Sequence, residues 1–71
     1  MVIYTKSDCQ PCRLTKAALA RKGITFTERN VEEDPDAYAE VKALGYLAVP
    51  VVVTEDDHWQ GLRPDKIAAL V

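Results

Sequence analysis

Long apolar segments and blocks of like charge are both missing from this sequence of 71 residues. No stretch approaches the ~20 apolar residues that a membrane-spanning helix needs. No cluster of Lys or Arg marks a segment that would lie on a membrane surface. The net charge of −2 argues against a nucleic-acid-binding protein, which usually has a basic face. We therefore expect no contact with a membrane or with nucleic acid.

The chain is also too short for more than one domain, and we expect residues 1–71 to form it. A chain of this size buries only ~60% of its unfolded surface, so its stability depends on good packing. Hydrophobic residues make up 48% of the sequence, which is enough for a core and too many for a disordered chain.

Cysteine is scarce, with Cys9 and Cys12 as the only two. The apolar run Met1–Tyr4 is too short for a signal peptide and no positive region precedes it, so we expect a cytoplasmic protein. The cytosol is reducing, and a cysteine pair there is more often catalytic or metal-binding than structural. A bridge between these two residues would close too small a loop to stabilise the fold much.

Hydrophobic patterning predicts the element order β-α-β-α-β-β-α. Val2–Thr5 has almost no polar interruption, which predicts a strand buried on both faces and therefore central in a sheet. Strands joined by a helix should be parallel, and strands joined by a tight turn antiparallel. The other predicted strands are Thr25–Arg29, Val51–Thr54 and His58–Gln60, and the predicted helices are Pro11–Lys22, a helix from Asp34-Pro35 that ends at Gly45, and a helix that starts at Pro64.

Apolar residues at helical spacing predict which face of each helix points inward. They are Leu14, Ala17 and Ala18 in the first helix, Tyr38, Val41 and Leu44 in the second, and Ile67 and Leu70 in the third.

Cys9 and Cys12 lie where the first predicted strand gives way to the first predicted helix. In a cytosolic protein with a βαβ start, a C-x-x-C spacing predicts a redox pair. The first turn of a helix has unpaired N–H groups and a partial positive charge, which lower the pKa of a thiol held there. We expect Cys9 to attack a substrate disulfide and Cys12 to resolve the mixed disulfide.

Neighbouring residues modify this expectation. Lys6, Arg13 and Lys16 can add positive potential near the sulfur and Asp8 opposes it, and the sequence does not say which of them face it. Pro11 lacks an N–H, which is harmless in a first helical turn, and it should stiffen the ring that the cysteines close on oxidation.

Two other interpretations of the cysteine pair stay open. Zinc needs four ligands, or three and a water, and His58 on the predicted hairpin is the only other good candidate. Otherwise His58 is interpreted as a solvated hairpin residue. The second alternative is that both cysteines are inert core residues. Asp36 and the run Glu32-Glu33 are interpreted as a solvated acidic face near a helix start.

Four segments together resemble the NrdH-redoxins, a family that is glutaredoxin-like in sequence and thioredoxin-like in behaviour. They are Val2–Lys6, the Cys9-x-x-Cys12 pair, Ala48–Val53 and His58–Pro64. The resemblance covers essentially the whole chain, and its last segment is the most diagnostic because ordinary glutaredoxins lack it. It implies an α/β protein with the thioredoxin fold, in which a four-stranded mixed sheet is flanked by helices.

The resemblance also implies a function. The oxidised protein would be reduced by NADPH-dependent thioredoxin reductase rather than by glutathione, and the reduced protein would pass electrons to the large subunit of class Ib ribonucleotide reductase. The redox-active centre is then the Cys9–Cys12 disulfide, with no bound cofactor or metal, and we expect a monomer.

Two other functions are weighed against this one. A glutathione-dependent glutaredoxin commonly has Gly-Gly near the last helix, whereas this chain has only Gly61 there, so this alternative ranks lower. A metal carrier or scaffold, with Cys9 and Cys12 binding zinc or an iron–sulfur cluster between two chains, ranks lower still.

The chain departs from the family pattern at two places. The family usually has Trp-Ser-Gly-Phe-Arg-Pro, whereas Gln60 and Leu62 stand here for Ser and Phe, so family contacts at these positions are not carried over. Between the cysteines the family usually has Val-Gln or a similar pair. Gln10-Pro11 is instead similar to thioredoxin and favours reducing behaviour.

Pro50 resembles the cis-proline that faces the active-site disulfide in this fold, which would turn the Val49 backbone toward the substrate chain. The alternative, a trans proline at the start of an edge strand, is commoner for prolines in general. Trp59 is interpreted as a core residue or a partner contact, and Arg63 as binding a partner carboxylate or its own Asp65. The residues predicted to bind substrate or partner are Lys6, Gln10, Pro11, Val49, Pro50, Trp59, Gly61 and Arg63.

Overall fold

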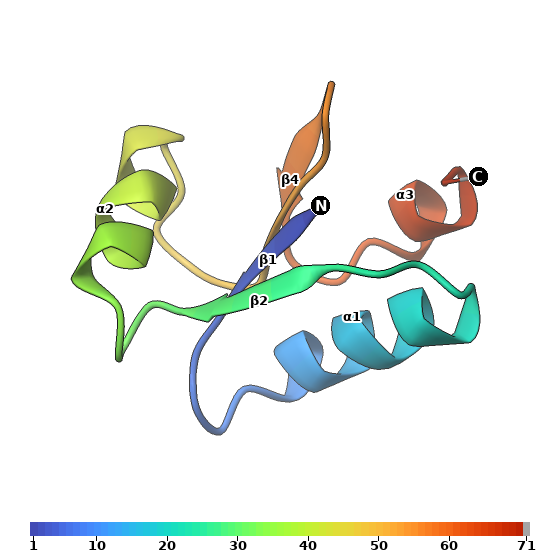
Figure 1. The fold of residues 1–71 in the computed structure, drawn as a ribbon, viewed down its shortest axis with the longest axis horizontal. Helices are drawn as coiled ribbons and strands as arrows, with labels where there is room; N and C mark the ends of the chain where they lie inside the picture. Colours follow the sequence, from blue (N-terminus) through green and yellow to red (C-terminus); the bar gives the residue numbers. More distant parts are fainter. Residues whose placement is uncertain (71) are drawn as a thin grey trace.

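The computed structural model describes residues 1–70, and Val71, the last residue of the predicted domain, lies outside the described residues. The strands and helices follow in the predicted order (Figure 1). The strands are β1 (Val2–Thr5), β2 (Thr27–Asn30), β3 (Val51–Val53) and β4 (His58–Gln60), and the helices are α1 (Gln10–Arg21), α2 (Pro35–Ala43) and α3 (Pro64–Ala68).

The strands form one mixed sheet in the order β2-β1-β3-β4. β1 pairs in parallel with β2, to which α1 connects it, and antiparallel with β3. β3 and β4 form an antiparallel hairpin. The predicted central place of β1, the parallel first pair and the final hairpin are all confirmed.

Successive side chains of a strand point to opposite faces of the sheet, so the core is divided into two clusters, one on each face. Ile3, Val52 and Trp59 stand opposite one another on β1, β3 and β4, and they pack with residues of α1 and α3. Tyr4 and Val51 form the neighbouring pair and belong to the cluster that packs with α2. α1 and α3 therefore cover one face and α2 the other, as Figure 1 shows. No helix of the described residues is both long enough and apolar enough to traverse a bilayer.

The predicted inward face of α1 is wrong for Leu14 and Ala17 and holds only for Ala18, which is half-buried and packs against the core. The side chain of Leu14 is 46% exposed and Ala17 is also exposed, whereas Cys12, Thr15 and Leu19 are buried against the sheet. The burial of Cys12 sets the rotation of the helix, because residues three and seven positions further along share its face. This rotation turns the side chains of Leu14 and Ala17 toward solvent.

The inward face of α2 is also corrected in part. Val41 is buried as predicted, but it shares its face with Ala37, and the side chains of Tyr38 and Leu44 are exposed. A small residue at position 37 lets the helix approach the sheet closely, while the larger Tyr38 remains outside.

The second strand starts later than predicted, at Thr27 instead of Thr25. Its pairing begins where the Thr27 N–H donates to the carbonyl of Met1. Ile24 and Phe26 before it are in a loop and pack against the α1 side of the core, so their apolar character reflects burial without strand pairing. In the third helix, Ile67 is buried as predicted, whereas Leu70 follows the end of α3 and is half-buried.

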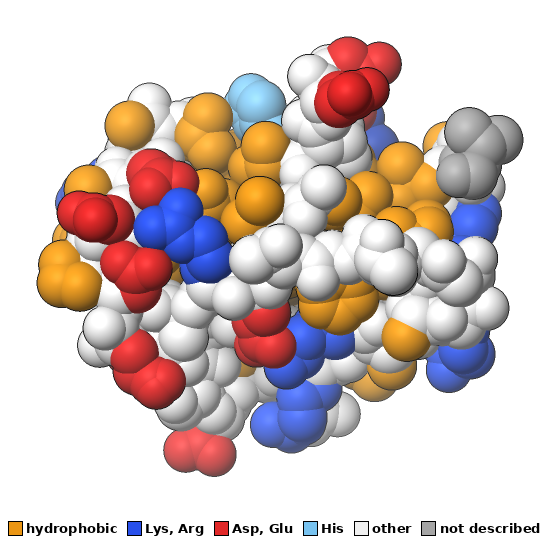
Figure 2. Space-filling model, in the orientation of Figure 1, with side chains coloured by type: hydrophobic (Ala, Val, Ile, Leu, Met, Phe, Trp, Pro, Cys, Tyr) orange, Lys and Arg blue, Asp and Glu red, His pale blue; other side chains and the backbone are white. Residues whose placement is uncertain are grey.

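Polar side chains fasten α2 to the sheet. Asp34 caps the helix, and its carboxylate accepts the N–H groups of Asp36 and Ala37 at 3.0 and 3.2 Å. Glu40 accepts hydrogen bonds from the Tyr4 hydroxyl and from Arg29. Figure 2 shows acidic side chains gathered over this end of the molecule and at the tip of the β3–β4 hairpin.

Candidate active site

Cys9 and Cys12 form a disulfide at the start of α1, with their Cα atoms 5.2 Å apart. Cys9 is the N-cap residue, and its Sγ accepts a hydrogen bond from the Cys12 N–H at 3.2 Å. Pro11 occupies the first turn, where its missing N–H costs no helical hydrogen bond. Cys9 is 5% exposed and Cys12 is 1% exposed, so both residues are buried and Cys9 is slightly the more accessible.

Two other segments meet at the end of the sheet where β1 leads toward this disulfide. Pro50 precedes the first residue of β3, which lies opposite Tyr4 near the end of β1. The Val49–Pro50 peptide bond is cis, which confirms the sequence prediction. Gly61 donates its N–H to the Pro50 carbonyl at 2.7 Å. The backbone N–H and C=O groups of Val49 bond no other described residue.

Hydrogen bonds that the sequence did not predict hold the loop before Cys9. Asp8 has φ 53°, a left-handed conformation that Asp tolerates better than most residues. The preceding Ser7 donates its N–H to Glu32 at 3.0 Å, and Asn30 donates to the Ser7 hydroxyl at 3.5 Å. Glu32 is exposed, as the interpretation of a solvated acidic face stated, and its carboxylate also links the β2–α2 loop to the active-site loop.

The cations near the cysteines have different roles. Lys16 is paired with Glu28 at 2.9 Å, so the positive potential expected from it is largely neutralised. Lys16, and then the Thr5 hydroxyl, hold the pKa of Glu28 below its ordinary value. Arg13 donates to the side chain of Gln10 at 3.4 Å. Lys6 is exposed and makes no ion pair with another described residue.

Two predicted partner-binding residues are occupied within the chain. Trp59 is a core residue, as one of its two interpretations stated, and only 4% of its surface is open to a partner. Arg63 is the N-cap residue of α3, where its side chain makes no capping hydrogen bond, and it pairs with Asp65 at 2.8 Å, which favours its intrachain interpretation. Trp59 and Arg63 nevertheless lie close to Gly61 in the sequence, one before it and one after it.

His58 is exposed on the β3–β4 hairpin, as predicted, and it also contacts a residue outside the hairpin. Its Nδ1 is 2.7 Å from the hydroxyl of Tyr46, and the two rings meet edge to face. This contact joins the α2–β3 loop to β4. Among residues 1–70, no group of three His, Cys, Asp or Glu side chains is placed to hold a metal ion.

The glutaredoxin family model matches residues 1–59. The chain belongs to the glutaredoxin family. This glutaredoxin is 40% identical over 70 residues to the glutaredoxin-like protein NrdH of Escherichia coli K12, over 99% of this chain and 86% of that protein. It is 33% identical to NrdH of Lactococcus lactis subsp. cremoris MG1363, over 99% of this chain and 97% of the relative.

Solved structures agree with this assignment. The glutaredoxin-like NrdH-redoxin from Escherichia coli superimposes with a TM-score of 0.93 at 40% identity, over 99% of this chain and 92% of that one. The NrdH-redoxin resemblance, the thioredoxin fold and the class of thiol–disulfide oxidoreductase are thereby confirmed. The Cys9–Cys12 pair is the redox-active feature of this glutaredoxin.

Proposed function

We propose that this chain carries two electrons at a time from NADPH-dependent thioredoxin reductase to the large subunit of class Ib ribonucleotide reductase. The observation that carries the proposal is a C-x-x-C disulfide at a helix N-terminus in a chain whose curated relatives are NrdH proteins. The Escherichia coli relative is described as having a thioredoxin-like activity profile. We further propose that the protein works in the cytoplasm as a monomer without a bound cofactor.

The proposed reaction assigns the attack to Cys9, the N-cap residue of α1, and the resolving step to Cys12 in the first turn of the helix. The Cys9 thiolate attacks one sulfur of the substrate disulfide, forms a mixed disulfide and releases the other sulfur as a thiolate that takes a proton from water. Cys12 then gives up its proton and attacks Cys9 Sγ, which releases the second substrate thiol. Two electrons leave the protein, and the Cys9–Cys12 disulfide remains for the reductase to reduce.

Val49, Pro50 and Gly61 are proposed to hold the substrate chain during this exchange. The unpaired backbone groups of Val49 are suited to an extended peptide, because such a chain offers its own N–H and C=O groups in a row. Lys6, Gln10 and Pro11 border the cysteines in sequence and complete the proposed contact surface.

The second candidate is a glutathione-dependent glutaredoxin, which the family match itself favours. The segment Gly61–Pro64 argues against it, because it lacks the Gly-Gly pair common in that class and its Arg63 is already paired with Asp65.

A comparison of two reducing systems separates the candidates. One assay supplies NADPH and thioredoxin reductase, the other glutathione and glutathione reductase, and both use insulin disulfides as the acceptor. We expect turnover with thioredoxin reductase. Turnover with glutathione alone would contradict the proposal. A second assay, in which the reduced protein is the sole donor to a class Ib ribonucleotide reductase, tests the acceptor.

A further inference from the structure

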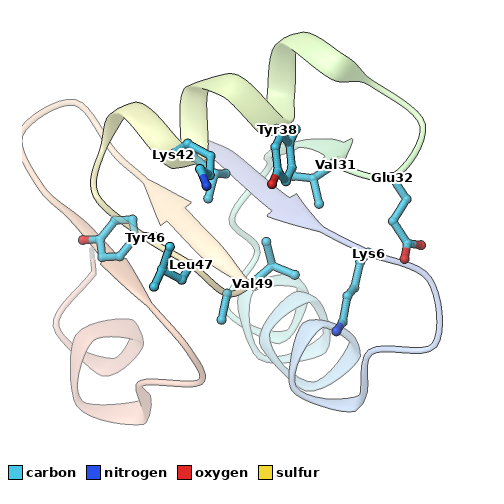
Figure 3. A pocket seen from close by; sticks show the side chains of 10 residues that line it. Lys6, Val31, Glu32, Tyr38, Lys42, Tyr46, Leu47 and Val49 are labelled. Carbon is cyan, nitrogen blue, oxygen red and sulfur yellow. The ribbon is translucent and has the colours of Figure 1, made fainter.

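A surface cavity of about 530 Å³ lies beside the segment that contains Val49. Its walls come from four parts of the chain: the loop after β1, the β2–α2 loop, α2, and the loop that leads to Pro50 (Figure 3). The lining includes the side chains of Lys6, Glu32, Tyr38, Lys42, Leu47 and Val49.

The charge of this cavity is opposite to that of the chain as a whole. Lys6 and Lys42 line it, and neither makes an ion pair with another described residue. Glu32 is the one carboxylate among the described lining residues, and one of its oxygens already accepts the Ser7 N–H. The cavity is therefore net positive in a chain with a net charge of −2.

The cavity also offers apolar contacts. The side chain of Leu47 is 91% exposed, although a large apolar side chain gains by being covered. Tyr38 is exposed as well, and its ring lies 5.7 Å from Lys42 Nζ. The surroundings of Lys42 therefore combine one cation with two apolar surfaces, which suits a peptide segment better than a simple anion.

The position of the cavity connects it to the proposed exchange reaction. Val49 lines the cavity and also has unpaired backbone groups next to Pro50. A substrate chain that pairs with Val49 while its cysteine meets Cys9 would place the residues next to that cysteine in the cavity.

We propose that the cavity selects protein disulfides whose cysteine is flanked by acidic residues. The occupant is an extended acidic segment of the substrate, with separate carboxylates facing Lys42 and Lys6, which lie on opposite sides of the cavity (Figure 3), and an apolar part against Leu47 and Tyr38. This inference rests on the proposed dithiol exchange with a protein disulfide, and it adds the charge of the preferred substrate.

The test uses two synthetic peptides, each with one internal disulfide, that differ only in Glu or Gln beside the cysteines. The protein is reduced beforehand with dithiothreitol, desalted and mixed with each peptide, so that no reductase is needed. We expect the Glu peptide to react roughly two- to fivefold faster at low salt, because one ion pair between partly exposed charges stabilises a complex by about that factor. The difference should shrink as salt is added.

Lys42→Glu should abolish the preference for the Glu peptide, and Lys42→Arg should keep it. Arg21→Glu is the matched control, because it changes the net charge equally, also lies in the last turn of its helix and is outside the cavity lining. Both substitutions carry the same cost at a helix C-terminus.

The outcomes distinguish a failure of the proposed function from a failure of the proposed substrate preference. If the wild-type protein reduces neither peptide, the proposed function fails. If it reduces both at equal rates at low salt, or if Arg21→Glu removes the preference as fully as Lys42→Glu, this inference alone is overturned. Suppression of the preference by glutathione, at concentrations that leave the Gln peptide unaffected, would assign the cavity to glutathione and would also overturn it.

Discussion

The backbone N–H of Cys12 points at the sulfur of Cys9 from 3.2 Å. A thiolate at the N-cap keeps this donor and gains from the partial positive charge of the helix end, whereas a neutral thiol gains less. This hydrogen bond is present in the disulfide form, and after reduction it favours the thiolate of Cys9, which is the reactive form.

We predict that reduced Cys9 has a lower thiol pKa than free cysteine and than Cys12. Gln10→Glu should raise this pKa by placing a negative charge in the first turn of α1, and Gln10→Lys should lower it. The ultraviolet absorbance of the thiolate, followed through a pH titration, measures both shifts. A Cys9 thiol that ionises like free cysteine in all three proteins would contradict this account of the site.

We predict that Cys12→Ser traps the mixed disulfide with a substrate. Cys9 can still attack, but no second sulfur remains to release the product. Mass spectrometry should find the substrate thiol attached to Cys9, and Cys9→Ser should give neither adduct nor turnover. An adduct on Cys12 in the Cys9→Ser protein would mean that the two roles are reversed.

Leu19→Ala should lower the free energy of unfolding by about 2–5 kcal/mol, the usual cost of removing a large buried aliphatic side chain. Leu19 is fully buried, whereas Leu14 on the same helix is half exposed. Leu14→Ala should therefore change stability by less than about 1 kcal/mol. Urea unfolding of both variants measures the difference. Equal losses would show that α1 is rotated from the orientation described above.

We predict that Thr15→Val stabilises the protein by about 1 kcal/mol. The Thr15 hydroxyl is buried and has no hydrogen-bond partner among the described residues, so its desolvation is uncompensated. Valine keeps the shape and removes the polar atom. Thr15→Ser, which keeps the hydroxyl and removes the methyl group, should destabilise. A loss of stability in the valine variant, measured by urea unfolding, would show that the hydroxyl is satisfied.

The sequence predicted the element order because local signals were strong. β1 and β4 have the predicted bounds, and Asp34 followed by Pro35 marked the start of α2 correctly. The Cys9–Cys12 pair and the cis bond before Pro50 were also predictable, the latter only through the family resemblance.

The features that the sequence did not predict depend on contacts between distant parts of the chain. Periodicity alone gave Leu14 the inward place on α1, because Cys12 and Thr15 do not count as strongly apolar. Nothing local shows that Glu32 accepts the Ser7 N–H, 25 positions away in the sequence. The cavity likewise needs four separate segments to come together, so its charge could not be predicted from any one of them.

Stability should fall more steeply in acid for the wild-type protein than for Glu40→Gln. Hydrogen bonds from Tyr4, and then from Arg29, lower the pKa of Glu40 from its ordinary 4.5. A carboxylate with a depressed folded-state pKa stabilises the fold above the unfolded-state pKa, and this contribution is lost as pH falls through the folded value. The stabilisation from Glu40 is therefore lost over a pH range that begins near 4.5 and extends below it.

Urea unfolding of both proteins at neutral pH and at successive values down to about pH 3 measures this slope. The Gln variant should be the less stable at neutral pH, and the two curves should converge in acid. Glu33→Gln is the control, because the Glu33 carboxylate makes no ion pair with the described residues. It should follow the wild-type curve. Parallel curves for wild type and Glu40→Gln would mean that the Tyr4–Glu40–Arg29 contacts do not control the acid sensitivity of the fold.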